Sequence, residues 1–168
     1  MSMHADLVQQ FDLSGRVALV TGGSGALGRA MARGLAMAGA RVALLARRPE
    51  RLQEAVAEIE QLGGEALALP GDVLDRASLE KARETLLRRW DRLDILVNGA
   101  GGNVREATLE PGHAVFELTE EAFRKVIDLN LMGTILPTLI FGEVMARQRR
   151  GVIVNVSSMA ATRILTRV

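Results

Sequence analysis

The sequence contains no cysteine and no tyrosine among its 168 residues, and lysine occurs only at Lys81 and Lys125. Without cysteine, disulfides and thiolate metal sites are excluded. Charge of one sign is also lacking, because 21 Lys and Arg stand against 20 Asp and Glu. This balance argues against a dedicated nucleic-acid binder and gives no reason to expect anionic lipid as a partner.

Long hydrophobic runs are missing as well. No apolar stretch approaches the roughly 18 residues of a membrane span, and residues 1–12 carry no signal-peptide core. The two histidines, His4 and His113, have no partners at metal-ligand spacing, so we expect surface histidines and no metal site. The sequence therefore predicts a soluble cytoplasmic protein with no membrane partner.

The composition that remains is that of a folded domain. Hydrophobic residues make up 48% of the chain and charged residues 24%. These fractions are ordinary for a globular protein and exclude a disordered one. The length suits a single domain over residues 1–168.

Short apolar runs alternate with helical patterns from end to end. The runs predicted to be strands are Arg16–Thr21, Val42–Leu45, Ala66–Leu69, Asp94–Val97 and Gly151–Val156, and the first of them is typical of a buried parallel strand. Strands that alternate with helices of this kind indicate βαβ units. Because their crossovers are right-handed, they favour a Rossmann-type α/β fold, a doubly wound parallel sheet with helices on both faces. Ligands of such folds bind at the carboxyl ends of the strands.

Apolar residues at helical spacing predict four helices. Their apolar faces are Leu27, Met31, Leu35 and Ala38; Leu52, Val56, Ile59 and Leu62; Leu79, Ala82, Leu86 and Trp90; and Phe123, Val126, Ile127 and Leu131. Pro49 suits a first helical turn, and Asp75 and Thr119 suit N-caps. We expect the fourth helix to be kinked near Gly133 or Pro137.

A glycine-rich turn, Thr21-Gly-Gly-Ser-Gly-Ala-Leu-Gly28, joins the first predicted strand to the first predicted helix. At such a turn unpaired N–H groups and the positive end of the helix dipole face one point, which makes an anion site. Glycines let the backbone approach phosphates, and the last one lets helix and strand pack closely. The motif alone could be a tight corner, but its place between strand and helix favours a dinucleotide phosphate site.

The sequence resembles the short-chain dehydrogenase/reductase family at five landmarks that occur in order between Leu13 and Val168. The family's first turn reads Thr-Gly-x-x-x-Gly-x-Gly, and here Ala26 replaces its middle glycine. The other landmarks are Asp72-Val73 after the third strand, Asn98-Gly-Ala-Gly101 after the fourth, Asn130 in the last helix, and Asn155-Val-Ser-Ser158 at the end of the fifth strand.

This resemblance implies an NAD(P)-binding Rossmann domain that transfers a hydride between nicotinamide and a carbonyl or secondary alcohol of a small molecule. The expected cofactor-binding residues are Thr21, Gly22, Ser24, Gly25, Ala26, Leu27, Gly28, Arg47, Asp72, Val73, Asn98, Gly99, Ala100 and Gly101. The implied catalytic residues are Ser158, which would polarise the substrate oxygen, and Asn130, while Ser157 would support the strand end. The family also implies a homo-oligomer, with an interface on the helix that carries Leu136, Leu139, Ile140 and Phe141.

Several landmarks have a structural alternative. Asp72 could cap the turn after Pro70-Gly71, and Asn98 could satisfy backbone groups at the strand end without touching cofactor. Asn130 lies inside a predicted helix, where asparagine is disfavoured, so its presence needs a structural or a catalytic reason.

Arg47 bears on the choice of cofactor. Dinucleotide folds place an acidic residue about 20 positions after the turn for NAD, or an arginine for the 2′-phosphate of NADP. The second predicted strand ends in Leu45-Ala46-Arg47-Arg48, with Ala46 where an NAD-type aspartate would stand. A guanidinium matches a phosphate dianion, so NADP(H) is favoured over NAD(H). The alternative is a solvated arginine pair beside Glu50.

The family's acid/base pair is absent from the chain. In that family a tyrosine follows the serine, and a lysine four residues later lowers the pKa of the tyrosine. This chain has no tyrosine, and both lysines precede the fifth strand. We therefore expect the N-terminal part of an enzyme, inactive by itself and lacking its last strands and helices. The alternative is a non-catalytic dinucleotide-binding or interaction fragment.

The loop after the fourth strand concerns the substrate. The stretch Gly101–Leu118 is long for this fold, so we expect it to be functional or mobile. Together with Ala100-Gly-Gly-Asn103 it resembles family members that act on sugar acids such as gluconate or mannonate. Asn103, Arg105 and His113 could meet a hydroxylated anion there, although surface loops carry such residues in any case.

Overall fold

The computed structural model describes residues 9–112 and 114–161. Within them five parallel strands form one sheet in the order β3-β2-β1-β4-β5. The strands are β1 Val17–Thr21, β2 Arg41–Ala46, β3 Ala66–Pro70, β4 Ile95–Asn98 and β5 Val152–Asn155. All five predicted strands are confirmed, and their ends shift by one residue at most. The order reverses between β1 and β4, as in a doubly wound Rossmann-type sheet.

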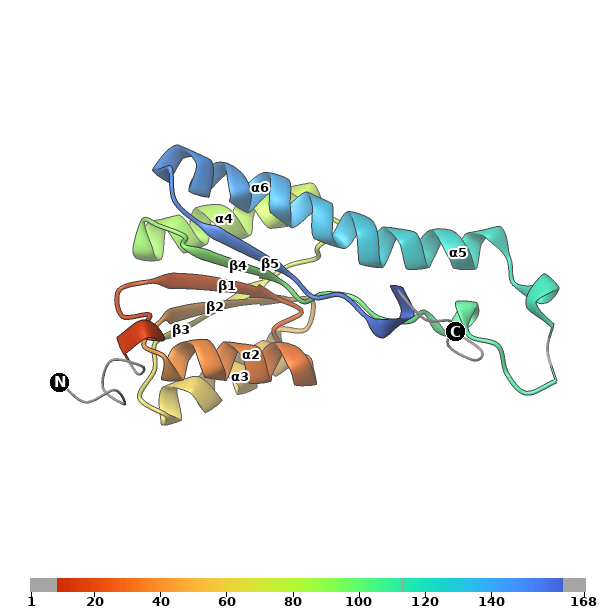
Figure 1. Ribbon diagram of the computed structural model, residues 1–168, viewed down its shortest axis with the longest axis horizontal. Coiled ribbons are helices and arrows are strands. Elements are labelled where there is room, and N and C mark those ends of the chain that lie inside the picture. The colour runs from red at the N-terminus through yellow and green to blue at the C-terminus, as the bar shows by residue number, and fades with distance from the viewer. Residues whose placement is uncertain (1–8, 113, 162–168) are drawn as a thin grey trace.

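Helices cover both faces of this sheet. Figure 1 shows α2 (Ala26–Met37) and α3 (Pro49–Gln61) on one face, with α4 (Arg76–Trp90) and α6 (Gly133–Gln148) on the other. Side chains that alternate along a strand point to opposite faces. In β1, Val17 therefore joins the core beneath α4 and α6, whereas Ala18 joins the core beneath α2 and α3. Burial on both faces explains the continuous apolar runs of β1 and β2, whereas every residue of β5 is exposed among the described residues.

The predicted helix starts are confirmed. Pro49 opens α3, and the Asp75 carboxylate accepts a hydrogen bond from the Ala77 N–H at 3.0 Å at the start of α4. Thr119 caps α5 (Glu120–Ile127) in the same way, through the Ala122 N–H at 3.2 Å. Each cap satisfies an N–H group that the first helical turn leaves without an intrahelical partner.

The helix predicted to be kinked near Gly133 or Pro137 is irregular just before Gly133. A π-helical turn, Asp128–Met132, joins α5 to α6 in one helical run, and Pro137 lies buried within α6. The Asn130 amide donates to the Val126 carbonyl at 2.9 Å. This side chain thus hydrogen-bonds a backbone carbonyl of the same helical run, four residues before it.

Several residues predicted to lie on apolar faces are exposed instead. Leu27 is 71% exposed because it lies in the first turn of α2, next to the glycine-rich turn, and Leu62 is 52% exposed because it follows the end of α3. Phe123, Ile127 and Leu131 are about half exposed. The reason is visible in Figure 1, where α5 extends past the ends of the strands.

The helical run Glu120–Gln148 also corrects the expectation about long apolar runs. By length and composition alone it could cross a membrane. Core helices of soluble proteins pass the same test, and here Ile140, Phe141 and Met145 pack beneath the sheet with α4. The α6 part of the run is thus a layer of the α/β fold, while 28% of the apolar window as a whole is buried.

Candidate functional site

A groove of about 470 Å³ lies at the carboxyl ends of the strands, beside the point where the strand order reverses. This is the ligand position of doubly wound sheets. Its lining residues are Gly22, Ser24, Gly25, Ala26, Leu27, Gly28, Leu45, Ala46, Arg47, Arg48, Gly71, Asp72, Val73, Gly99, Ala100, Gly101 and Leu129. Twelve of the fourteen residues predicted to bind cofactor are in this set, and Thr21 and Asn98 are the two that are not.

Two glycines of the glycine-rich turn, Gly22 and Gly28, pack so closely against backbone atoms that neither admits a Cβ. A Cβ on Gly28 would lie 2.2 Å from the Gly22 carbonyl oxygen. Gly22 itself has φ +68°, and a Cβ there would lie 2.8 Å from the Gly99 oxygen. Only glycine tolerates both constraints. The turn is therefore folded tightly against the ends of β1 and β4.

The departure from the family pattern at Ala26 falls where a side chain has room. Ala26 is the first residue of α2, and it is exposed at the groove. Its neighbour Gly25 is the N-cap, where no side chain caps the helix and the first turn holds no acidic residue. The N–H groups of this first turn therefore face the groove together with the positive end of the helix dipole, which suits a phosphate.

Thr21 holds two groove-lining residues in place through its hydroxyl group. It is fully buried, and its hydroxyl oxygen accepts hydrogen bonds from the Gly99 and Ala100 N–H groups, both at 3.1 Å. It thereby ties the end of β1 to the chain that leaves β4. Thr21 positions lining residues instead of lining the groove itself.

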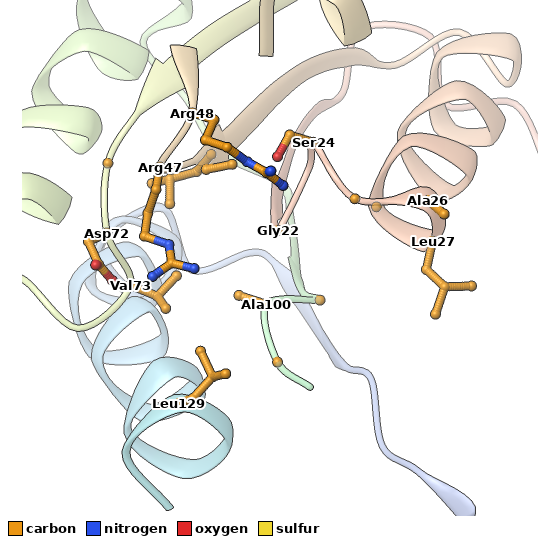
Figure 2. Close-up of a pocket in the computed structure, with 17 residues that line it drawn as sticks. Gly22, Ser24, Ala26, Leu27, Arg47, Arg48, Asp72, Val73, Ala100 and Leu129 are labelled. Atoms are coloured by element: carbon orange, nitrogen blue, oxygen red, sulfur yellow. The ribbon is translucent and has the colours of Figure 1, made fainter. Parts of the chain in front are cut away.

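Two arginines, Arg47 and Arg48, form the charged end of the groove. Figure 2 shows their guanidinium groups directed into it from the end of β2, with the Ser24 hydroxyl directed into it from the glycine-rich turn. Among the described residues neither guanidinium has a hydrogen bond or a carboxylate partner. Ala46 precedes them and carries no acid. Two cations without a protein counter-charge suit an anionic ligand group.

Asp72 is both a turn residue and a groove residue. One carboxylate oxygen accepts a hydrogen bond from the Leu74 N–H at 3.0 Å, which is the turn role weighed from the sequence. The side chain still lines the groove, beside Val73. Val73 lines the groove and also packs in the core beneath α4 and α6.

Asn98 follows the structural alternative. It is 2% exposed and does not line the groove. Its amide donates to the Thr138 hydroxyl at 2.9 Å and to the Asn155 side-chain oxygen at 2.8 Å. It therefore connects β4, β5 and α6 beneath the site.

The Asn130 side chain clamps the loop after β4. Its oxygen accepts from the Gly102 N–H, and its nitrogen donates to the Gly102 and Val126 carbonyls, each at 2.9 Å. Both amide hydrogens are thus used to hold the loop and the helix, and the catalytic role of Asn130 stays a prediction. Gly101 allows this approach, because a Cβ there would lie 2.8 Å from the Asn130 oxygen.

Ser157 and Ser158 leave the end of β5, and both are exposed. The Ser158 oxygen accepts a hydrogen bond from the Ala160 N–H at 3.2 Å. A serine hydroxyl can accept and donate at once, so its O–H remains available to a substrate oxygen. In the described chain Ser157 has no hydrogen-bond partner, and Asn155 makes the side-chain contact that supports the strand end.

The predicted substrate residues lie outside the groove lining. Asn103 and Arg105 are exposed on the loop after β4, which holds two short 3₁₀ turns, Arg105–Ala107 and Val115–Glu117. His4 and His113 lie outside the described residues. In the described part of the chain no cluster of three metal-ligating side chains occurs.

Five lining residues were not predicted as binding residues: Leu45, Ala46, Arg48, Gly71 and Leu129. The first four adjoin predicted site residues at the ends of β2 and β3, so strand ends alone could have indicated them. Leu129 comes from the π-helical turn, 28 positions after Gly101. No local pattern places it beside the glycine-rich turn.

The fold and the groove define a dinucleotide-binding α/β protein. A model of the short chain dehydrogenase family matches residues 16–167, and the chain belongs to that family. It is 41% identical over 165 residues to the uncharacterized oxidoreductase UxuB of Bacillus subtilis, covering 94% of this chain and 59% of the relative. The chain thus spans about three fifths of that relative's length.

Solved structures agree with this assignment. One, from Haemophilus influenza, is proposed to be a D-mannonate oxidoreductase and holds bound NAD; it superposes with a TM-score of 0.88 at 31% identity, over 96% of this chain and 61% of its own. A metagenomic short-chain oxidoreductase in complex with NADP superposes with a TM-score of 0.79 at 34% identity, over 91% and 66%. Similar structures therefore bind either nicotinamide cofactor.

Proposed function

We propose that this chain forms the cofactor-binding part of an NAD(P)-dependent oxidoreductase that interconverts a secondary alcohol and a carbonyl compound. The observation that carries the proposal is the groove at the strand-order reversal. There a turn that accepts no Cβ at Gly22 or Gly28 meets an uncapped helix start. A bound nicotinamide dinucleotide would supply the hydride acceptor or donor.

The lining residues fit such a cofactor in their chemistry. The first turn of α2 offers N–H groups for the diphosphate, and Arg47 and Arg48 offer cations at the other end of the groove. Asp72 and Val73 would border the adenine, as the family resemblance implies. Gly99, Ala100 and Gly101 would leave room for the backbone to approach the cofactor.

The proposed role of Ser158 is to donate its O–H to the substrate oxygen and so stabilise charge that develops there. A proton must also move at that oxygen, and a chain without tyrosine lacks the family's acid/base group. We therefore propose that the 168 residues bind cofactor without turnover, and that turnover needs a protein that also carries Tyr-x-x-x-Lys. The absence of tyrosine equally favours the second candidate, a dinucleotide-binding module that does not catalyse.

Two measurements separate these candidates. Fluorescence titration of the 168-residue chain with NADPH and NADH should show saturable binding, and no binding of either would refute both candidates. In a protein that carries Tyr-x-x-x-Lys, Ser158→Ala should lower kcat by about 10²-fold with cofactor Kd nearly unchanged. Ser157→Ala is the matched control and should be milder. Equal effects of the two changes would refute the assignment of Ser158.

We propose further that NADP(H) is preferred over NAD(H). The support is the Arg47–Arg48 pair, which faces the groove without a protein counter-charge in the described chain, and the neutral Ala46 before it. Arg47→Asp should weaken NADPH binding by roughly 1.5–3 kcal/mol, more than tenfold, and leave NADH within about twofold. Arg33→Asp makes the same charge change at an exposed position of α2 outside the groove. Equal losses for both cofactors would refute the preference.

We propose a sugar acid or a polyol as the substrate class. The support is the resemblance of the Ala100–Asn103 loop to sugar-acid enzymes, together with the D-mannonate activity proposed for the Haemophilus structure. Arg105 is exposed on this loop and could meet a carboxylate. In the active protein, Arg105→Ala should raise KM for mannonate or gluconate and leave KM for a polyol unchanged. Failure to oxidise any sugar acid or polyol in such a panel would overturn the proposal.

We propose a homo-oligomer in which a second copy covers the exposed side of the long helical run. That side carries an apolar residue at every fourth position: Phe123, Ile127, Leu131, Ile135 and Leu139, which are between 37% and 57% exposed. Residues four apart share a helix face, and contiguous exposed apolar surface favours association. Of the interface residues expected from the sequence, Ile140 and Phe141 are instead buried in this chain's own core.

Light scattering tests this assembly. Leu131→Glu should lower the measured mass, whereas Met37→Glu, which changes another exposed apolar residue on α2, should not. A monodisperse monomer of the unmodified protein at tens of micromolar would overturn the proposal.

We also propose that the protein works in the cytoplasm. The absence of cysteine is compatible with a reducing compartment. Burial of Ile140 and Phe141 against the sheet gives the long helix a partner other than lipid. Cell fractionation should recover the protein in the soluble cytoplasmic fraction, and recovery with membranes would refute this.

A further inference from the structure

Three polar side chains meet beneath the groove, where β4 and β5 end next to α6. Asn98 ends β4, Asn155 ends β5 and is paired with it, and Thr138 lies in the middle of α6. The Asn98 nitrogen donates one hydrogen to the Thr138 hydroxyl oxygen at 2.9 Å and the other to the Asn155 side-chain oxygen at 2.8 Å. The Val156 N–H donates to the Asn98 carbonyl at 3.0 Å.

We propose that Asn98, Thr138 and Asn155 form a positioning network that holds the end of β5 and thereby places Ser158. The role of Ser158 rests on the proposed function, while the network itself rests on the contacts above. The pairing of β4 with β5 ends at Asn98 and Asn155. After it, the described residues Val156, Ser157 and Ser158 make one backbone hydrogen bond to the sheet, from the Val156 N–H to the Asn98 carbonyl.

Among the described residues, the end of β5 has few other contacts. Every residue of β5 is exposed, and the strand lies at the edge of the described sheet. Strand ends with few buried contacts open locally at low free-energy cost. Asn98, in contrast, is 2% exposed within the sheet. Its amide therefore ties the exposed end of β5 to β4 and α6.

The donors and acceptors of this network are not interchangeable. Asn98 contributes through its two N–H groups, because its side-chain oxygen is buried and accepts no hydrogen bond from the described residues. Thr138 and Asn155 contribute as acceptors. Thr138→Ser keeps an acceptor, whereas Thr138→Val keeps the shape and removes it. This pair of variants isolates one hydrogen bond.

Hydrogen exchange on the 168-residue chain tests the network without any need for turnover. Thr138→Val should make the Val156 amide exchange about tenfold faster, as expected for the loss of one buried hydrogen bond. Amides of β1 should be unchanged, and Thr138→Ser should match the unmodified protein. If the Thr138→Val variant does not fold, the Asn155→Ala variant is measured in its place. Its control is then Asn155→Asp, which keeps a hydrogen-bond acceptor. Unchanged exchange at Val156 would overturn the network.

Kinetics in a protein that carries Tyr-x-x-x-Lys test the positioning of Ser158. Thr138→Val should lower kcat about tenfold with cofactor Kd and substrate KM unchanged, and Thr138→Ser should restore kcat. Faster exchange with unchanged kcat would overturn the positioning role and leave a purely structural contact. If the unmodified protein shows no turnover, the proposed function fails, and the exchange result alone decides whether the network holds the strand.

Discussion

Replacing Gly28 by alanine should destabilise the protein, whereas the same replacement at Gly34, six residues further along α2, should stabilise it. A Cβ on Gly28 would lie 2.2 Å from the Gly22 oxygen and 2.8 Å from its carbonyl carbon. Both are backbone atoms, so no rotamer change can relieve the contact. A Cβ on Gly34 would meet no atom within 4 Å.

The magnitudes follow from these two environments. Overpacking costs up to about 3 kcal/mol, and the higher helix propensity of alanine returns about 1 kcal/mol, which leaves a net loss of about 2 kcal/mol for Gly28→Ala. At Gly34 only the propensity gain of about 0.5–1 kcal/mol remains. For a chain of this size, Tm should fall by about 4–8 °C in the first variant and rise by about 2 °C in the second.

Urea denaturation followed by circular dichroism measures both changes on the 168-residue chain. Titration with NADPH should also show weaker binding for Gly28→Ala, because the turn must open to admit the methyl group. Binding by the Gly34→Ala variant should be unchanged, since Gly34 does not line the groove. If the two variants change stability in the same direction, the close packing of this turn is not what requires glycine at position 28.

Two further predictions concern the N-terminal end of the sheet and the loop clamp. Burial alone would raise the pKa of Asp94, but hydrogen bonds from the Arg92 guanidinium and the Val17 N–H hold that pKa below its ordinary value. Asp94→Ala should therefore cost about 2–3 kcal/mol at pH 7. The stabilisation is present above the unfolded pKa of about 3.9 and is lost as pH falls through the folded pKa. Denaturation at pH 7 and pH 3 should show the two proteins converging, and a constant gap would contradict the linkage. Gly101→Ala should displace the Asn130 amide and speed proteolysis of the loop after β4, and Asn130→Ala should do the same. In the double variant the two effects should not add, and additive rates would show that the residues act separately.

The strands and the first-turn glycines could be predicted from the sequence because their causes are local. A parallel strand covered on both faces needs an unbroken apolar run, and β1 and β2 show one. A helix start leaves N–H groups unsatisfied, which favours Asp75 or Thr119 at that position. Both patterns depend on residues a few positions apart, so strands and helix starts can be predicted without knowledge of the fold.

The roles of individual site residues depended on distant parts of the chain. Asn98 and Asn130 stand in the expected motifs, yet their amides are used to hold Thr138, Asn155 and Gly102. A hydrogen bond between residues 40 or 57 positions apart leaves no periodicity in the sequence. Only the folded arrangement shows whether such a side chain faces a ligand or the scaffold.

The alternation of strands and helices, the glycine-rich turn and the charged end of β2 could all be predicted from the sequence, since each follows from local backbone sterics or from neighbouring residue types. Which apolar residues are covered is visible only in the folded chain. Phe123 and Ile140 lie on the same helical run, but Ile140 is buried in α6, which covers the sheet, whereas Phe123 is half exposed in α5, which extends past the strand ends (Figure 1). Burial is a property of what packs against a side chain, and for this helix that is set by the length of the strands beneath it.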